Sequence, residues 1–156
     1  MIRIESADPT KAPRRISGVY ADPVAWLITD AVAAVLNTRG ALDPTTVGVL
    51  VVSEHSTEHT QRLVAETVAQ GRISPMRFAA AGPGSLVGVV CAAFGFQGPT
   101  LMLSMSAEHA TPVVDALLSD WLHDSAEHVI VVTHDIAEDG RHSVTCSVVD
   151  GRSEPR

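Results

Sequence analysis

The stretch "SMSAEHA", residues 104–110, places hydroxyl, carboxylate and imidazole side chains within a few positions of one another. Ser104 and Ser106 offer nucleophilic hydroxyl groups, while Glu108 and His109 offer an acid and a base, a set suited to acyl transfer or hydrolysis. If a helix begins at this corner, His109 is expected to point away from the serine three positions earlier. Serines at such corners commonly bond to the backbone. A turn without chemistry and a serine-dependent enzyme therefore both stay open.

A second chemical pattern is "HSTEH", residues 55–59, in which His55 and His59 are one helical turn apart and Glu58 stands beside them. The pattern fits an inverted zinc-peptidase motif. A catalytic zinc needs a third protein ligand from another element, and the simpler interpretation is a solvated first turn of a helix. The stretch "AGPGS", residues 81–85, has the glycines of a phosphate-binding loop but no lysine and no preceding strand. We expect no metal and no cofactor.

The sulfur-containing side chains are predicted to fill space. Cys91 and Cys146 lie inside apolar segments and are expected to be buried, reduced thiols. Met102 and Met105 are expected to fill the core or an interface. The remaining histidines flank predicted turns and are expected at the surface: His123, His128, His134 and His142.

Composition narrows the class of protein. The chain has 156 residues, 46% of them hydrophobic, which suits a single domain over residues 1–156. A net charge of -7 with scattered Lys and Arg argues against nucleic-acid and anionic-membrane partners. The apolar run at residues 84–96 ends well short of the roughly 20 residues that cross a bilayer. We expect a cytoplasmic protein with flexible ends at residues 1–13 and 151–156.

Strand-like and helix-like segments alternate along the chain. The helix that follows Asp22 has Pro23 at its first position and Gly40 at its end, and the later helix at residues 85–96 is so apolar that burial on all sides is expected. The corner at residues 104–109 joins a strand to a helix. Strands are predicted at residues 14–20, 46–54, 99–106, 127–136 and 142–150, and helices at 22–40, 56–71, 85–96 and 109–124, with an irregular segment at 73–84. The sum is a three-layer α/β domain with a mixed sheet.

The order of these elements and the amino-acid sequence of residues 74–117 resemble the N-terminal half of a β-ketoacyl synthase of the thiolase superfamily. Residues 16–150 share the resemblance, which is sharpest where a Ser-Pro loop precedes a helix of small residues and a "GPT" turn at residues 98–100. It implies a thiolase-like half-domain whose mixed sheet packs against a buried central helix.

The family's catalytic elbow follows that turn. Counting from it, Ser104, Met105 and Ser106 match the elbow's serine, threonine and alanine, and Ala107 falls where the nucleophilic cysteine is found. That cysteine carries the acyl chain as a thioester, which a methyl group cannot do. The family also takes two histidines from a C-terminal half with no counterpart here. The resemblance therefore implies a chain without condensing activity.

In the thiolase superfamily, the strand before the elbow lies at the dimer seam and pairs antiparallel with the same strand of a partner. The corresponding segment here is uncharged, and left unpaired it would be open to aggregation. The predicted interface comprises Thr100, Leu101, Met102, Leu103, Ser104, Met105 and Ser106.

The leading hypothesis is a catalytically dead, chain-length-factor-like accessory or assembly subunit in polyketide or fatty-acid-type biosynthesis. Its expected partners are a second copy or a ketosynthase, with acyl carrier protein as a further candidate. One alternative is an acyl-transfer or thioester-hydrolysing enzyme that uses Ser104 or Ser106 with Glu108 and His109. The other is an acyl-chain binding module.

Overall fold

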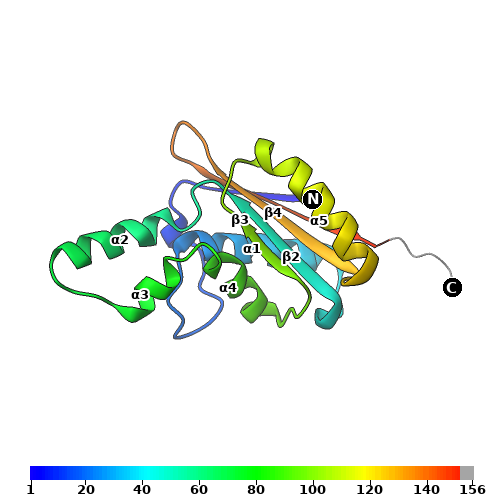
Figure 1. The fold of residues 1–156 in the computed structure, drawn as a ribbon, viewed down its shortest axis with the longest axis horizontal. Helices are drawn as coiled ribbons and strands as arrows, with labels where there is room; N and C mark the ends of the chain where they lie inside the picture. The colour runs from blue at the N-terminus through cyan, green and yellow to red at the C-terminus, as the bar shows by residue number, and fades with distance from the viewer. Residues whose placement is uncertain (152–156) are drawn as a thin grey trace.

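The computed structural model describes residues 1–151, in which helices cover both faces of a mixed sheet (Figure 1). The strands are β1 (Ile2–Ser6), β2 (Val47–Ser53), β3 (Thr100–Leu103), β4 (His128–Ile136) and β5 (His142–Asp150). The helices are α1 (Pro23–Arg39), α2 (Glu58–Ala69), α3 (Pro75–Ala80), α4 (Ser85–Phe94) and α5 (Ala107–Asp124), with 3-10 turns η1 (Pro9–Lys11) and η2 (Pro44–Thr46).

Within residues 1–151, the strand order is β1-β5-β4-β2-β3. β2 pairs parallel with both β3 and β4, and the antiparallel hairpin of β4 and β5 is extended by antiparallel β1. β2 is buried along its whole length, as its unbroken run of valine and leucine predicts. β3 and β1 are the two edge strands. The predicted α/β class with a mixed sheet is confirmed.

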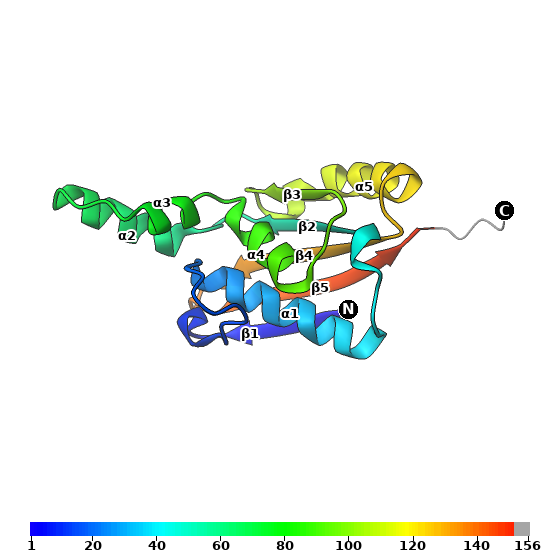
Figure 2. The same ribbon diagram turned by 90° about the horizontal axis from the view of Figure 1, so that it is seen from below.

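Two apolar layers hold the sheet between its helices. α1 and α4 lie on one face, where Ile28 and Leu86 pack against Val49 and Val51 of β2 in the main core. α5 covers the other face, where Trp121 packs with Leu50 and Val129. α5 packs on β4 and β2, and α1 lies along β5 and β1 on the other face (Figure 2). The three layers follow from the alternation of side chains along β2, which supplies both cores.

Asp22 ties two helices together at the carboxyl end of the sheet. Its side chain is fully buried, and its Oδ1 accepts the Val24 N–H at 2.9 Å as the cap of α1. Its Oδ2 accepts the Thr60 N–H in the first turn of α2, also at 2.9 Å. One carboxylate therefore holds the base of α2 against the start of α1.

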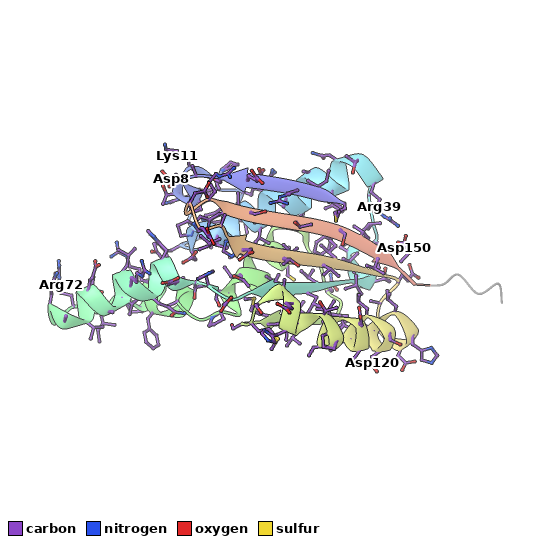
Figure 3. The ribbon with its side chains drawn as sticks, turned by 90° about the horizontal axis from the view of Figure 1, so that it is seen from above. Asp8, Lys11, Arg39, Arg72, Asp120 and Asp150 are labelled. Carbon is purple, nitrogen blue, oxygen red and sulfur yellow. The ribbon has the colours of Figure 1, made fainter. Side chains whose placement is uncertain are left out.

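α2 and α3 form a two-helix arm that projects beyond the carboxyl ends of the strands (Figures 1 and 2). Only Thr60 of α2 and Ala80 of α3 are buried, and both lie near the base. Arg72, in the turn between the helices, lies at the far end of the arm (Figure 3). The arm thus has no apolar core of its own.

The N-terminal prediction is wrong. Residues 14–20 form no strand, and Ile2–Ser6 supplies the edge strand β1 in its place. Ile2 and Ile4 pack on the main core while Arg3 and Glu5 are exposed, the alternation of a strand with one buried face. The expected flexible end at residues 1–13 is therefore incorrect for this segment. Of the other expected flexible end, residues 152–156 lie outside the described part.

Three helix predictions need correction. α4 is not buried on all sides, because Gly88 and Ala92 are exposed while Leu86, Val87, Val89 and Val90 are buried. The segment predicted to be irregular contains α3, which Ser74 caps through its side chain. The amphipathic pattern of residues 56–71 predicts that Val68 of α2 faces inward, but Val68 is 48% exposed.

Candidate functional site

The elbow between β3 and α5 is present, although the strand is shorter than predicted. β3 ends at Leu103, residues 104–106 form the corner, and α5 begins at Ala107. Ala107 is exposed in the first turn of the helix. The backbone N–H groups at such a helix start favour negative charge and lower the pKa of a thiol placed there.

Ser106 and His109 lie together, contrary to the prediction that His109 would point away. Ser106 Oγ is 2.7 Å from His109 Nδ1. Ser106 is the N-cap residue of α5, yet its hydroxyl group caps no backbone N–H because it is turned towards the imidazole. Both His109 and Glu108 are exposed, and within residues 1–151 no hydrogen bond joins Glu108 to the ring. The pair has the contact of a nucleophile and base but lacks a third group that orients the base.

Ser104 belongs to a different set of contacts. Its Oγ lies 3.2 Å from Ser56 Oγ in the loop after β2. Ser56 has a φ of 45°, in the left-handed region, and its N–H donates to Ser53 Oγ at 2.9 Å. The bond from the end of β2 offsets the cost of that backbone conformation. The elbow is therefore connected through Ser56 to the carboxyl end of β2.

A buried chain of hydrogen bonds continues from Ser53 into β4 and β5. Ser53 Oγ lies 2.7 Å from His134 Nδ1, and His134 Nε2 lies 3.0 Å from His142 Nδ1. Ser53 is fully buried and His134 is 2% exposed. Burial, followed by the neighbouring His142 and His55, lowers the pKa of His134 from 6.5 to about 4. Burial also lowers the pKa of His142.

The proton positions in this chain follow from the need to satisfy every buried donor. Since Ser53 Oγ accepts from the Ser56 N–H, its own proton is best donated to His134 Nδ1. His134 Nε2–H then donates to His142 Nδ1, which leaves the His142 Nε2–H as a donor. This chain of hydrogen bonds, called the relay below, fixes the side chains of Ser53, His134 and His142 relative to one another. Because Ser53 is fully buried, its hydroxyl group cannot attack a substrate.

His134 was predicted to be at the surface, and that prediction is wrong. Its position opposite Ser53 in the parallel β2–β4 ladder explains the contact. The usable signal was that both residues stand at the carboxyl ends of parallel strands, where polar side chains from different strands meet. Sequence reasoning missed this contact because it took His134, near the end of a predicted strand, for a surface residue that flanks a turn.

A pocket of about 530 Å³ lies beside this relay, between the N-terminal segment and α2. Its polar lining includes His55, His59, His134 and His142, and its apolar lining includes Val24, Leu63 and Ile136. His55 Nδ1 is 3.3 Å from Glu58 Oε2, and Glu58 also pairs with Arg62. In the part of the chain that the structure describes, no three His, Cys, Asp or Glu side chains are grouped as metal ligands.

The prediction of a buried thiol is confirmed for Cys146, whereas Cys91 is only half-buried. Cys146 is fully buried in β5, where burial raises the pKa of its thiol to about 12. Cys91 is half-buried at the margin of the main core, and burial raises its pKa as well. Neither thiol has the environment of a nucleophile.

Comparisons with known proteins identify the fold. No family model and no curated protein matches the chain. Among solved structures, the chain is similar to a chain of the complex between the ketosynthase ApeO and its chain length factor ApeC, from Xenorhabdus doucetiae, with a TM-score of 0.64 and 15% sequence identity. The match covers 86% of this chain and 59% of that one, so this chain spans less than two thirds of its neighbour's length.

This similarity shows that the chain has a thiolase-like fold related to that of ketosynthases. The fold predicted from the sequence is therefore confirmed. In addition, no helix within residues 1–151 combines the length and apolar character needed to cross a membrane.

Proposed function

We propose that this chain is a non-catalytic, ketosynthase-like accessory subunit of polyketide or fatty-acid-type biosynthesis that pairs with a ketosynthase through β3. The observation that carries the proposal is the open edge of β3. β3 pairs with β2 on one side, and its other side has no strand partner within residues 1–151. An unprotected edge in a thiolase-like sheet is suited to pairing with the strand of another subunit.

The chemistry of the two sheet edges supports this choice. Thr100–Leu103 carries no charged side chain, and Leu101 is 37% exposed. β1, at the opposite edge, exposes Arg3 and Glu5, which form an ion pair at 3.0 Å. Charged side chains protect an edge against pairing. The β3 edge is thus the one that can accept a partner.

The elbow supports a non-catalytic role. Ala107 stands where the resemblance expects the acyl-carrying cysteine, and its methyl group forms no thioester. The similar solved structure is that of a ketosynthase in complex with its chain length factor. A chain that spans 59% of that neighbour's length and lacks the nucleophile is better suited to assembly than to condensation.

Affinity purification of the tagged chain from its source tests the proposed pairing. We expect a ketosynthase to be recovered and identified by mass spectrometry. Leu101→Lys should abolish its recovery because it places a charge in the seam. Val113→Lys is the matched control, since Val113 is 38% exposed on α5, close to the 37% of Leu101. Recovery that survives Leu101→Lys, or the absence of any ketosynthase, would contradict the proposal.

The contact between Ser106 and His109 favours one competing function, a serine-dependent acyl transferase or hydrolase. Intact mass spectrometry after incubation with acyl thioesters separates the two functions. The accessory role predicts no acyl adduct on the natural chain. In a separate measurement, the thiol introduced by Ala107→Cys should react with iodoacetamide faster than Cys91 or Cys146, because it stands at a helix start. An acyl adduct that disappears in Ser106→Ala would establish the enzyme instead.

A further inference from the structure

The pocket beside the relay lies where two neighbouring strands send the chain in opposite directions. β2 and β4 are adjacent and parallel, but the chain leaves β2 towards β3 on one side and leaves β4 directly into β5 on the other. Open α/β sheets bind ligands in the crevice that such diverging connections leave at the carboxyl ends of the strands. His55 and Ser56 follow β2, Ile136 ends β4, and all three line the pocket. The pocket therefore stands where a sheet of this kind binds a ligand.

The walls of the pocket are held in place by the protein alone. Asp22 Oδ1 accepts the N–H of Val24, and Asp22 Oδ2 accepts the N–H of Thr60, each at 2.9 Å. Val24 lines the pocket from α1, and Thr60 lies in the first turn of α2 beside His59, which lines the pocket from the other side. The volume of about 530 Å³ is in the range of small-molecule sites, which are usually formed before the ligand arrives.

One face of α2 is directed at the pocket instead of at a core. Its lining residues recur three or four positions apart, which is the spacing of a single helical face. This face is mixed, because one apolar side chain stands among charged and imidazole side chains. The lining from α2 consists of Glu58, His59, Arg62, Leu63 and Glu66. Such a mixture suits a ligand that has a polar head and an apolar part.

The charges of the lining determine the sign of that head. Asp8 on the N-terminal side and Glu58 and Glu66 on α2 are acids, and Arg62 is the one base among them. Arg62 pairs with Glu58, and Lys11, outside the lining, lies 3.7 Å from Asp8. Within residues 1–151 no ion pair engages Glu66. The excess of negative charge disfavours anions and attracts a cation.

The histidines at the base of the pocket do not reverse this sign. Burial, followed by the neighbouring His142 and His55, lowers the pKa of His134 to about 4, and burial lowers the pKa of His142 as well. Both rings are therefore neutral at pH 7. They add polar atoms and ring surface to the lining but no positive charge that would hold an anion.

We propose that this pocket binds a small organic amine, whose ammonium group pairs with Glu66 and whose apolar part packs against Val24, Leu63 and Ile136. The three apolar side chains come from α1, α2 and β4, so the ligand contacts three elements at once. The site is separate from the β3 edge and does not depend on the pairing in the proposed function.

Three six-carbon probes that differ in their head group test the assignment: hexylamine, 1-hexanol and hexanoate. The ring signals of the seven histidines report the place of binding in NMR spectra at pH 7.5. We expect hexylamine to leave three histidines unchanged and to shift the four that line the pocket, His55, His59, His134 and His142. 1-Hexanol should bind roughly threefold more weakly or worse, because it lacks the charge. Hexanoate should give no saturable shift.

Glu66→Gln tests the charge of the pocket with little change in its shape. It should weaken the binding of hexylamine roughly threefold or more and leave that of 1-hexanol unchanged. Glu138→Gln is the matched control, because Glu138 is also exposed but lies in the turn after β4, outside the lining.

Four outcomes would overturn the proposal. These are equal binding of hexylamine and 1-hexanol, tighter binding of hexanoate, hexylamine binding that Glu66→Gln leaves unchanged, and the absence of a saturable shift confined to the pocket histidines. Because none of these outcomes involves β3, each leaves the pairing in the proposed function to its own test.

Discussion

His134 is a buried side chain that positions the residues around the elbow without taking part in any chemistry there. Its ring lies between Ser53 and His142, with both nitrogens in hydrogen bonds. Ser53 in turn holds Ser56, which contacts Ser104 at the elbow. The neutral form of one imidazole therefore supports the geometry of the loop beside the proposed interface.

This arrangement predicts a loss of stability in mild acid. Because the pKa of His134 is about 4 in the folded chain and near 6.5 when unfolded, the unfolded chain binds the proton more tightly. The contribution of neutral His134 to stability is complete above pH 6.5 and is lost as the pH falls towards 4. The free energy of unfolding should fall by about 2–3 kcal/mol over that range. Urea unfolding at pH 7.5 and pH 4.5 measures the difference.

His134→Gln supplies the comparison for this measurement. The variant should be less stable at pH 7.5 but should lose less stability on acidification, while His109→Gln, at an exposed site, should keep the natural pH dependence. An identical pH dependence in His134→Gln would show that other groups cause the acid sensitivity.

The candidate site was predictable where it depends on chain order and unpredictable where it depends on register. The strand-to-helix corner before Ala107 follows from the alternation of apolar residues up to Leu103 and the helical pattern after it. The Ser53–His134 contact requires the alignment of β2 with β4, which are far apart in the sequence. The contact of Ser106 with His109 depends on a side-chain rotamer, which no pattern specifies.

At the scale of elements, the turn before β3 determines how the proposed seam strand is set against β2. Gly98 donates its N–H to the carbonyl of Val47 at 3.1 Å, and Pro99 accepts the Val49 N–H at 2.9 Å. A Cβ atom on Gly98 would lie 2.5 Å from the Val47 oxygen, closer than atoms can pack. The glycine is required for the close approach of two backbones.

Gly98→Ala should therefore destabilise the fold by about 1–3 kcal/mol through overpacking. Gly88→Ala is the matched control, because a Cβ there meets nothing within 4 Å. In the interior of α4 that change should stabilise the chain by about 0.5–1 kcal/mol. Thermal unfolding of the two variants compares them directly, and equal effects would mean that the turn can relax.

The elements that the sequence predicted well are those with caps and long apolar runs. α1 begins after Asp22 and ends at Gly40, as its capping residues indicate, and the apolar run of β2 is buried throughout. β1 was missed because five residues of modest alternation gain their strand structure from pairing with β5. α3 was missed because its six residues make fewer than two helical turns, too few to show a helical pattern. Its start depends on the Ser74 cap.

At the scale of the whole molecule, the open β3 edge and the projecting arm are the features that fit the proposed role as a subunit. The open edge of β3 lies on the opposite side of the sheet from the charged β1 edge, and the arm exposes Ile73, Met76 and Phe78. Exposed apolar side chains of this kind fit the proposed role as a subunit. The comparison of Leu101→Lys with Val113→Lys tests the edge directly.

The difference between the two edge strands also limits how far assembly can proceed. Arg3 and Glu5 occupy β1, and Arg141 pairs with Glu5 beside them, so within residues 1–151 β3 is the sheet edge that carries no charged side chain. Under the proposed pairing, each molecule has a valence of one, because its uncharged edge is used in the first contact and β1 presents charged side chains to any further strand. An uncharged strand that would seed a filament in a sheet with two open edges would then end growth at the first step.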